Sequence, residues 1–385
     1  MKDYFSSGFK LGILGGGQLG KMLLTIAQQW NLHTRILDPD PEAPARYGSR
    51  DFVQGDFTDY QTVYNFGKTV DVLTVEIENV HTGALKKLQD EGISVYPQPS
   101  VLEIIKDKVE QKLFYRKHNI PTASFEIFDT AEHVKAAVAD KQLTFPSVWK
   151  AARGGYDGRG VRLIKNESDV KNLPDVKCIV EEKVRIKREI SVIVARNADG
   201  AVKTFPAAEM IFDSVAHQVD FVIAPARITS LTEEKAKALA VRIARSFGNV
   251  GLLAVEMFIT EQDELLVNEV APRPHNSGHF SREACITDQF EQHLRAVLNL
   301  PLGDTGLKIP AVTVNLVGNE GFEGRVKYEN LDEALSMEGV SLHVYGKHIT
   351  RPYRKMGHVT VVHPDVEKAL RIARKVKETV RIISE

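Results

Sequence analysis

Two glutamates in apolar stretches are the first candidates for chemistry. Glu256 stands in LLAVEMFI and Glu269 in ELLVNEVA. Burying a carboxylate among such residues costs free energy unless a positive charge compensates it. Asn268 adds a side-chain oxygen, and carboxylate and phosphate oxygens are the ligands that Mg²⁺ prefers. The pattern predicts Glu256 and Glu269 as ligands of Mg²⁺, with Mn²⁺ as the alternative ion. Salt bridges to a nearby lysine or arginine are the other interpretation.

A glycine-rich loop is the second candidate. Residues 150–160 read KAARGGYDGRG, so a predicted strand delivers Lys150 to a loop with four glycines. Glycine lets backbone N–H groups close over a polyphosphate without a side-chain clash. Lys150 supplies a point charge, and Arg153 or Arg159 can stabilise a transferring phosphoryl group. We expect a nucleotide phosphate site that is not a Walker A loop; a mobile glycine-rich hairpin is the alternative.

Polar side chains also crowd the loop after the predicted metal strand. Residues 271–279 read APRPHNSGH, which places Arg273, His275 and Asn276 together. We expect this loop to contact an anion or a substrate. His275 and His279 have the i,i+4 spacing of a zinc pair, but proline and glycine around them support no helix, so zinc is disfavoured.

Weaker signals surround a predicted strand at 178–182. The end of this strand and the linker after it could clamp an adenine edge, and a later glutamate could bind the ribose. These candidates are Glu181, Glu182, Lys183 and Val184 for adenine, and Glu189 for ribose.

The first glycine motif suggests a different cofactor. Gly15, Gly17 and Gly20 match G-x-G-x-x-G between a strand and a helix, and Asp38 follows at about the spacing of a ribose-binding acid. This is the dinucleotide fingerprint, in which backbone amides and a helix N-terminus face a phosphate. Alone it favours a nicotinamide enzyme; a tight turn without ligand is the alternative.

Alternating strands and helices must position these side chains. Over residues 1 to about 100 we expect strands at 11–14, 35–37, 70–76 and 93–96, with one helix after the first strand and another at 84–88, which implies a parallel sheet. Residues 100–118 are charged and helical, and Pro121 marks a border.

The rest of the chain mixes strands with a few helices. Strands are expected at 148–150, 178–182, 190–195 and 222–224, a helix at 232–247, and a hairpin of 252–259 with 264–270. After Pro310 we expect strands at 312–317, 341–345 and 358–362 and a basic helix at 366–382.

Composition narrows the class of protein. The chain has 385 residues and a net charge of −1, which gives no electrostatic reason to expect nucleic acid or an anionic membrane as partner. No apolar run is long enough to span a bilayer, and residues 1–10 show no signal-peptide pattern. Cys178 and Cys285 form no CxxC motif, which fits a reducing cytoplasm.

Taken in order, four motifs resemble one known family over nearly the whole chain. GILGGGQLGKML, KAARGGYDGRG, LLVNEVAPRPHNSGH and RKMGH look like the N5-carboxyaminoimidazole ribonucleotide synthase family. The combination of GGYDGRG with NEVAPRPHNSGH is specific, whereas the first glycine motif alone is not. The resemblance implies a purine-biosynthesis ligase that converts ATP, bicarbonate and aminoimidazole ribonucleotide through carboxyphosphate to ADP, phosphate and the N-carboxylated product. It also implies a homodimer.

The resemblance further implies an α/β and α+β fold of the ATP-grasp type. Three domains are expected: a doubly wound preATP-grasp domain at 1–105, an ATP-grasp domain at 106–305 and a small C-terminal domain at 306–385. A mobile lid is expected at about 121–185.

Site residues are carried over only where the motifs match. Contacts with ATP are implied for Lys108, Lys150, Gly155, Tyr156, Asp157, Gly158, Arg159, Gly160, Glu181, Glu182, Lys183, Val184, Glu189, Asn268 and Glu269. Contacts with the ribonucleotide, partly by similarity to a sister transformylase, are implied for Gln18, Leu19, Glu76, Tyr156, Arg273, His275, Asn276, Lys347, Arg354 and Lys355. Asp157, Lys355 and Arg273 are the candidates for guiding carboxyl transfer.

Two departures from the family pattern stand out. Met210 and Phe212 occupy positions where many relatives carry Asn and His, and neither can donate the same hydrogen bonds. Lys108 stands where relatives often carry Arg, which keeps the charge but not the bidentate geometry.

Three other functions compete with the carboxylating ligase. They are a formate-dependent ATP-grasp transformylase, a nicotinamide dehydrogenase that uses the first glycine loop, and a nucleotide-sensing module without catalysis. The dehydrogenase leaves residues 150–160 and the paired glutamates without a role.

Overall fold

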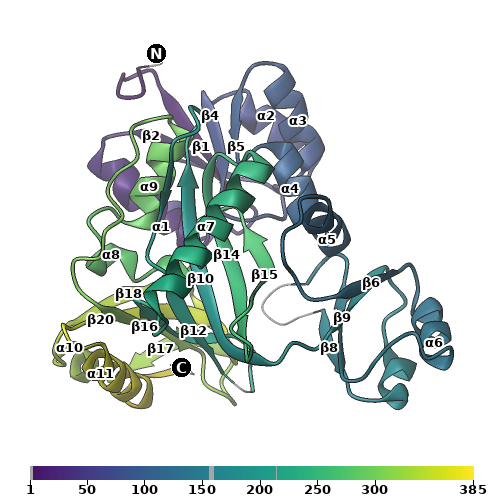
Figure 1. Cartoon of the computed structure of the whole chain (residues 1–385). Helices are drawn as coiled ribbons and strands as arrows, with labels where there is room; N and C mark the ends of the chain where they lie inside the picture. The colour runs from purple at the N-terminus through teal and green to yellow at the C-terminus, as the bar shows by residue number, and fades with distance from the viewer. Residues whose placement is uncertain (1–2, 156–159, 214) are drawn as a thin grey trace.

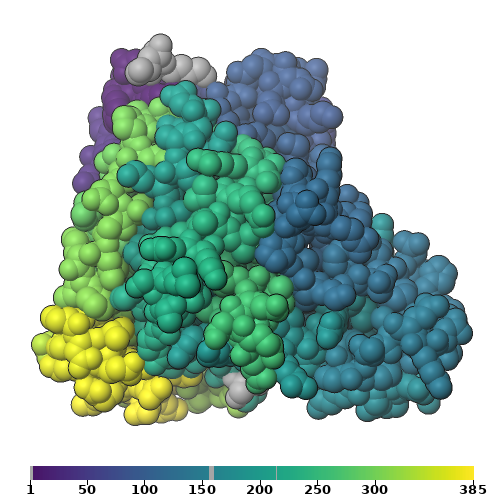
Figure 2. Space-filling model, viewed as in Figure 1, coloured from purple at the N-terminus to yellow at the C-terminus, as the bar shows by residue number. Residues whose placement is uncertain are grey.

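The computed structural model describes residues 3–155, 160–213 and 215–385. Its main body is built from two sheets with helices packed on them, and a third, smaller sheet projects from one side (Figure 1). In the space-filling view this projection is a separate lobe in the colour of residues from about 110 to 185 (Figure 2).

A five-stranded parallel sheet occupies the N-terminal region. Its order is β3-β2-β1-β4-β5, and every pairing is parallel. The strands are β1 (Lys10–Leu14), β2 (His33–Asp38), β3 (Asp51–Gln54), β4 (Val72–Val75) and β5 (Ser94–Tyr96). The helices are α1 (Gln18–Gln29), α2 (Tyr60–Gly67), α3 (Thr82–Asp90) and α4 (Pro99–Ile105), with a 3₁₀ turn, η1, at Arg46–Gly48. The predicted doubly wound sheet is confirmed, although β3 and α2 escaped the sequence analysis.

The segment predicted as helical at 100–118 is two helices. α4 ends at Ile105, and α5 (Lys108–Lys117) starts afresh after Asp107, whose carboxylate accepts the backbone N–H groups of Val109 and Glu110. A side-chain N-cap of this kind satisfies amides that have no partner inside the helix. The cap therefore fixes the point at which α5, and with it Lys108, begins.

The projecting lobe is a four-stranded antiparallel sheet. Its order is β6-β9-β7-β8. The strands are β6 (Phe125–Phe128), β7 (Ser147–Ala151), β8 (Val161–Ile164) and β9 (Cys178–Glu182), and α6 (Ala131–Ala139) and the 3₁₀ helix η2 (Glu167–Asn172) complete the lobe. Trp149 and Val134 lie in its own small core.

A larger antiparallel sheet forms the centre of the molecule. Its order is β15-β14-β10-β12-β13-β16-β20-β18, with β11 paired to β10. The strands are β10 (Ile186–Arg196), β11 (Val202–Thr204), β12 (Ala208–Phe212), β13 (Val219–Ala224), β14 (Gly251–Thr260), β15 (Leu265–Ala271), β16 (Ala311–Val317), β18 (Val340–Val344) and β20 (Lys355–Val362). The predicted hairpin of β14 and β15 is confirmed. Strands from both sides of the predicted domain border at 305/306 belong to this one sheet, and the border itself stays a prediction.

Shorter elements surround the central sheet. Between β13 and β16 the chain also forms three helices and a 3₁₀ turn: α7 (Ser230–Phe247), η3 (Asn276–Gly278), α8 (Ser281–Ala284) and α9 (Gln289–Val297). β17 (Gly324–Glu329), β19 (Ile349–Thr350) and β21 (Arg381–Ser384) form a small sheet, beside α10 (Leu331–Leu335) and α11 (Val366–Thr379). The helix predicted at 366–382 is therefore wrong at its end, because Thr379 closes α11 and Arg381–Ser384 pairs with β17 as a strand.

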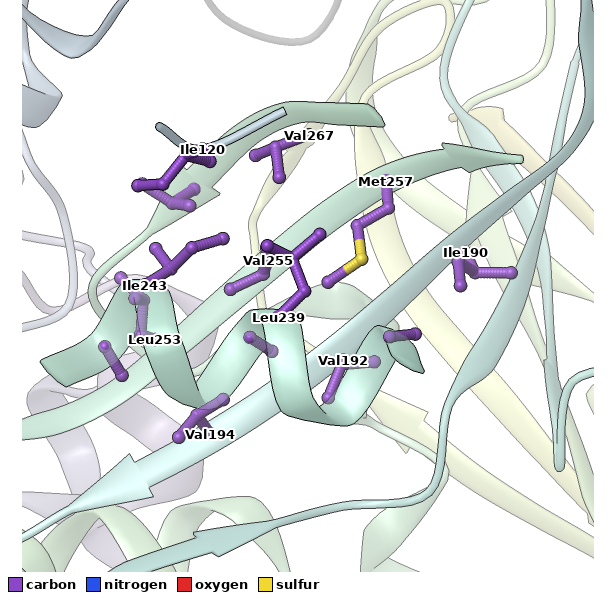
Figure 3. Packing of buried hydrophobic residues seen from close by; sticks show 14 of the residues in the cluster. Ile120, Ile190, Val192, Val194, Leu239, Ile243, Leu253, Val255, Met257 and Val267 are labelled. Carbon is purple, nitrogen blue, oxygen red and sulfur yellow. The ribbon is translucent and has the colours of Figure 1, made fainter. Parts of the chain in front are cut away.

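One face of the central sheet is covered by α7. Ile190, Val192 and Val255 point from the sheet into a shared core with Leu239 and Ile243 of the helix (Figure 3). Strand side chains alternate between faces, so the residues between these positions lie on the opposite face. That opposite face carries the candidate site. None of the helices in the described ranges is long and apolar enough for a membrane crossing.

The packing of α7 can be tested with a matched pair on the same helix. Ile243 is fully buried, whereas Leu231 is 60% exposed. Replacing a buried isoleucine with alanine typically costs about 2–5 kcal/mol, whereas an exposed substitution stays within about 0.5 kcal/mol. We expect Ile243→Ala to lower the urea midpoint of unfolding, followed by circular dichroism, and Leu231→Ala to leave it near that of the parent. Equal midpoints for the two variants would contradict this packing.

Candidate active site

A bulge in the β14–β15 hairpin gathers the predicted metal ligands. Val255 pairs with Val270 and Met257 with Val267, so Asn268 and Glu269 together oppose the single residue Glu256. In a regular ladder Asn268 and Glu269 would point to opposite faces of the sheet. An extra residue in one strand re-aims side chains in this way. Val267 and Val270 both stay in the core with α7, so the two residues between them are left for the other face.

Two lysines from different elements approach this group of oxygens. Lys108 Nζ, at the first residue of α5, lies 2.7 Å from Glu269 Oε2. Lys150 Nζ, on β7 of the lobe, lies 3.1 Å from Asn268 Oδ1. The fold therefore brings Lys108 and Lys150 to the same end of the hairpin as Asn268 and Glu269.

The two carboxylates differ in their electrostatics. The Lys108 ammonium holds the pKa of Glu269 well below its usual range, although 45% of that side chain is exposed. Burial, followed by the nearby Glu269 charge, raises the pKa of Glu256. Two carboxylates that share a site cannot both ionise cheaply, and the better-compensated one keeps its charge. His275 Nε2 lies 3.5 Å from Glu256 Oε1 and is the neighbour of that carboxyl on the 271–279 loop.

Glu181 does not present a free side chain toward an adenine. It is 4% exposed and forms two ion pairs, with Lys112 Nζ and Lys150 Nζ, each at 2.7 Å. Burial would raise the pKa of Glu181, but the two ammonium groups outweigh it and hold the pKa below its usual value. Burial lowers the pKa of Lys112 to about 8, against the opposing charge of Glu181.

The segment after Glu181 connects the lobe to the central sheet. Glu182 and Lys183 are exposed, and Val184 is half-buried. Glu189 lies on β10 opposite Phe258, on the face that also carries Glu256. Burial raises the pKa of Glu189 to about 7, with Lys150 opposing the rise.

The glycine-rich loop is described only at its two ends. Gly160 has a left-handed φ of 76°, and a Cβ there would lie 3.1 Å from the Cα of Gly155, so these two glycines touch at the base of the loop. Arg153 Nε lies 2.8 Å from Asp107 Oδ2, which ties the start of the loop to the cap of α5. The predicted contacts Tyr156, Asp157, Gly158 and Arg159 lie outside the described residues.

The first glycine loop already faces carboxylates of the protein itself. Gly17 N–H donates to Glu76 Oε1 at 3.0 Å, and Gly16 N–H donates to Asp38 Oδ2 at 2.6 Å. A Cβ on Gly15 or Gly17 would come within 2.8 Å of the Glu76 side chain. The amides that would hold a dinucleotide phosphate thus already donate hydrogen bonds to carboxylates of the protein, and Asp38 is not available to a ribose.

A cleft of about 870 Å³ separates this loop from the C-terminal part of the chain. Gly17, Asp40, Lys347 and Arg354 are among the residues that line it. Lys347 Nζ donates to the Lys355 carbonyl at 2.8 Å. Lys347 and Arg354, two of the cations predicted to contact the ribonucleotide, therefore line one cleft.

Lys355 is also close to the predicted metal ligand Glu256. Its positive charge opposes the rise in the pKa of Glu256, so the two side chains are near one another. Of these three predicted ribonucleotide contacts, Lys347 and Arg354 therefore line the cleft and Lys355 does not.

The other predicted substrate contacts differ in their surroundings. Arg273 Nε forms a 2.8 Å ion pair with Glu78, and its charge also opposes the burial that raises the pKa of Glu76. Asn276 has both side-chain amide atoms buried without a hydrogen-bond partner in the protein. Gln18 is half-buried, but Leu19 packs in the N-terminal core, so only its backbone could meet a ligand.

Comparison with known proteins identifies the family to which the chain belongs. The chain matches the ribonucleotide synthetase preATP-grasp domain over residues 9–106, the ATP-grasp domain over 113–290 and the phosphoribosylaminoimidazole carboxylase C-terminal domain over 311–372. It is 40% identical over 381 residues to the N5-carboxyaminoimidazole ribonucleotide synthase of Bacillus subtilis, which covers 97% of each chain. The chain belongs to the N5-carboxyaminoimidazole ribonucleotide synthase family.

Solved structures of the family confirm the ATP-grasp fold. The synthetase from Thermotoga maritima has a TM-score of 0.91 and 44% identity, over 98% of this chain and 100% of that one. The synthase from Aspergillus clavatus, crystallised with ADP and 5-aminoimidazole ribonucleotide, has a TM-score of 0.87 and 32% identity, over 97% and 98% of the two chains.

One departure from the family pattern has a structural counterpart. Met210 pairs with Glu189 across β12 and β10 and is buried, and Phe212 is half-buried at the end of β12. Both positions lie on the same face as Glu189, so an apolar edge borders the predicted ribose contact.

Three residues of the site were missed by the sequence analysis. Lys112 holds Glu181, Asp107 caps α5 and binds Arg153, and Glu78 holds Arg273. Lys112 could have been found, because it follows Lys108 by four residues and so shares its helix face. Asp107 and Glu78 have partners 46 and 195 residues away in sequence, and no local pattern marks such pairs.

The occupied glycine loop predicts that nicotinamide dinucleotides do not bind. Because Glu76 and Asp38 already accept the loop amides, a pyrophosphate there would meet two carboxylates. We expect no saturable change when NADH fluorescence is titrated with the protein. ADP with Mg²⁺, followed by calorimetry on the same preparation, serves as the positive control. Saturable NADH binding that ADP does not displace would contradict this interpretation.

Proposed function

We propose that this protein carboxylates 5-aminoimidazole ribonucleotide. It uses ATP and bicarbonate, releases ADP and phosphate, and forms N5-carboxyaminoimidazole ribonucleotide in de novo purine biosynthesis. The observation that carries the proposal is that one molecule has two separate sites, each with two cationic side chains. Lys108 and Lys150 stand beside Glu269 and Asn268, and Lys347 and Arg354 line a separate cleft. A ligase that uses ATP to carboxylate a sugar phosphate substrate needs one such place for the triphosphate and another for the sugar phosphate.

The nucleotide is assigned to the first place. Lys108 and Lys150 would contact its phosphates, with the loop from Gly155 to Gly160 closing over them. The connection at 181–184 would border the adenine, and Glu189 would accept the ribose hydroxyl groups. Phe258 and Met210, the cross-strand neighbours of Glu189, give this end of the site apolar walls, which suit a base.

The donor set also fits a magnesium ion. Mg²⁺ is usually held by one or two carboxylates together with phosphate oxygens. Glu256, Glu269 and the Asn268 amide oxygen would be its protein ligands. Burial, followed by the nearby charges of Glu269 and Glu189, raises the pKa of Glu256, and a bound cation would favour its ionised form. When bound, the ion neutralises phosphate charge and orients the triphosphate.

The ribonucleotide is assigned to the cleft. Its 5′-phosphate would lie against Lys347 and Arg354, since guanidinium and ammonium groups suit phosphate oxygens. Asn276, whose buried amide has both a donor and an acceptor unmet, would bind a polar group of the substrate. Gln18, Glu76 and the backbone of Leu19 would border the same substrate across the cleft.

The chemistry would take place between the two assigned substrates. A bicarbonate oxygen attacks the γ-phosphorus, the bond to the β-phosphate oxygen breaks, and ADP leaves. The substrate amine then attacks the carboxyl carbon of carboxyphosphate, phosphate leaves, and the nitrogen loses a proton. Lys355, near Glu256 and beside the cleft, and Arg273, beside Glu76, are placed to orient the carboxyl group; Asp157 is the third candidate. Water must be excluded because carboxyphosphate hydrolyses readily.

We further propose that the protein works as a homodimer in the cytoplasm. The family resemblance supports the dimer. Cys178 and Cys285 are both buried and unpaired, which fits a reducing compartment.

The proposed reaction is tested by measuring ADP formation with each co-substrate omitted in turn. We expect turnover that requires both bicarbonate and 5-aminoimidazole ribonucleotide, and an N-carboxylated product detected by mass spectrometry after isotopic labelling with ¹³C-bicarbonate. Replacing bicarbonate with formate should abolish turnover, because the alternative transformylase reaction needs formate. ATP hydrolysis that ignores both co-substrates, or turnover with formate alone, would overturn the proposal.

The role of Glu269 is tested by Glu269→Gln, with Glu264→Gln as the matched control. Glu264 is exposed at the turn of the same hairpin. Removing the Glu269 charge leaves Lys108 without its partner and weakens the proposed metal site, so we expect kcat to fall by about 10²- to 10³-fold. The circular dichroism spectrum should stay unchanged in both variants. Turnover in Glu269→Gln equal to that of the control would show that Glu269 has no part in phosphoryl transfer.

A further inference from the structure

Lys112 is a buried lysine that the assigned functions do not use. It follows Lys108 by one helical turn on α5 and is 2% exposed. Its Nζ lies 2.7 Å from Glu181 Oε1, while the other oxygen of Glu181 lies 2.7 Å from Lys150 Nζ. One buried carboxylate is therefore shared by two lysines, of which Lys150 is assigned to the nucleotide phosphates.

A second branch leads from Lys112 to the strand of the metal ligands. Lys112 Nζ donates to the Thr122 hydroxyl, which donates to the Val267 carbonyl at 2.7 Å. The next residue on that strand, Asn268, accepts from Lys150 Nζ at 3.1 Å. The interactions close into a ring that starts and ends on Lys112 and contains Lys150.

The ring joins three separately built parts of the molecule. Lys112 comes from α5, Glu181 and Lys150 from the projecting lobe, and Val267 from the central sheet. Val267 points into the core beneath α7, close to Ile120 (Figure 3), so this point of the ring is fixed. Lys150 is thus held relative to the metal hairpin both directly, through Asn268, and indirectly, through Lys112.

Charge gives Lys112 a second effect on Lys150. Two ammonium groups and one carboxylate leave a net charge of +1 in this buried group, from two positive and one negative charge. Without the Lys112 ammonium the group would be neutral, and Glu181 would have Lys150 as its one remaining partner in the ring. The carboxylate would then draw the Lys150 ammonium toward itself, and less positive charge would face a polyphosphate.

We propose that Lys112 is a positioning residue for phosphoryl transfer. By sharing Glu181 with Lys150, it keeps the Lys150 ammonium aimed at the nucleotide and beside the metal hairpin. This inference rests on the proposed function, because it assumes that Lys150 contacts the phosphates of ATP.

The test uses the full-length enzyme and the variant Lys112→Met, which keeps an unbranched side chain without the charge. Lys117→Met, an exposed lysine on the same helix, is the control. We expect Lys112→Met to lower kcat and to weaken binding of ADP with Mg²⁺, each by about 10- to 100-fold, because small displacements of a catalytic group cost rates of that order. The KM for the ribonucleotide should change by less than about twofold, since that substrate binds in a different cleft.

A double variant separates this role from mere packing. Adding Glu181→Gln to Lys112→Met restores the net charge to +1, carried by Lys150 alone. We expect the double variant to regain at least about fivefold in kcat and in ADP affinity over Lys112→Met, a non-additivity that signals coupled residues. A residue that only fills space would show no such rescue.

Several outcomes would overturn the proposal. Wild-type kcat and ADP affinity in Lys112→Met would do so, and so would a double variant no better than the single one.

If Lys112→Met does not fold, Thr122→Val takes its place; it cuts the second branch of the ring and leaves the charges intact. Thr122→Val should then lower kcat by about threefold or more with an unchanged ribonucleotide KM, because it loosens the hold on Lys112; parental kcat would refute the ring. The ADP measurement needs no bicarbonate or ribonucleotide, so it distinguishes failure of this inference from failure of the carboxylation reaction.

Discussion

The arrangement depends on compensating three carboxylates that meet at one place. Glu181, Glu256 and Glu269 come from two different sheets, and each would repel the others in a partly dry site. Lys108 and Lys150 supply opposing charge, and Lys112 adds a third cation on the side of the lobe. Breaking such a buried set by removing one partner is much more costly than replacing the whole set, because an uncompensated charge remains. The helix α5, the lobe and the hairpin are therefore held together by charges that we also propose to act on the nucleotide.

Much of the fold could be read from the sequence because its signals are local. Apolar runs followed by glycine or proline marked parallel strands, and two strand-like runs on either side of the turn at 261–263 marked the β14–β15 hairpin. The bulge at Asn268 and Glu269 could not be read in this way. Strict alternation puts these neighbours on opposite faces, and only the observed pairing of Val255 with Val270 and of Met257 with Val267 shows that both face the site. The chemistry of the residues was predictable, but their convergence depended on a register that single-sequence patterns do not encode.

The first glycine loop shows a different limit of sequence patterns. The spacing of Gly15, Gly17 and Gly20 correctly indicates backbone amides that face an anion. It does not tell whether the anion is a ligand phosphate or a carboxylate of the protein itself. Here the acceptors are Glu76, at the end of β4 some 59 residues away, and Asp38, at the end of β2. A strand-to-helix turn offers the same amides to a ligand phosphate or to a carboxylate of the protein, and only the tertiary fold decides between them. The fingerprint was therefore a sound description of local geometry and a poor guide to the cofactor.

The continuity of the central sheet fixes the separation between the two proposed substrate sites. Lys355 begins β20 and Glu256 lies on β14, and five strand-to-strand steps separate them in the order β14-β10-β12-β13-β16-β20. At about 4.8 Å for each step, a flat sheet would put these strands about 24 Å apart. Yet Lys355 is near enough for its charge to oppose the burial that raises the pKa of Glu256. The sheet must therefore curl, and in Figure 1 the strands β16 and β20 cross below β14 and β10 rather than continuing beside them. Because the strands between the two places are paired by hydrogen bonds throughout, this curvature is built into the sheet. In the proposed reaction, the distance between the two substrates is therefore set by the twist of the strands that lie between their sites.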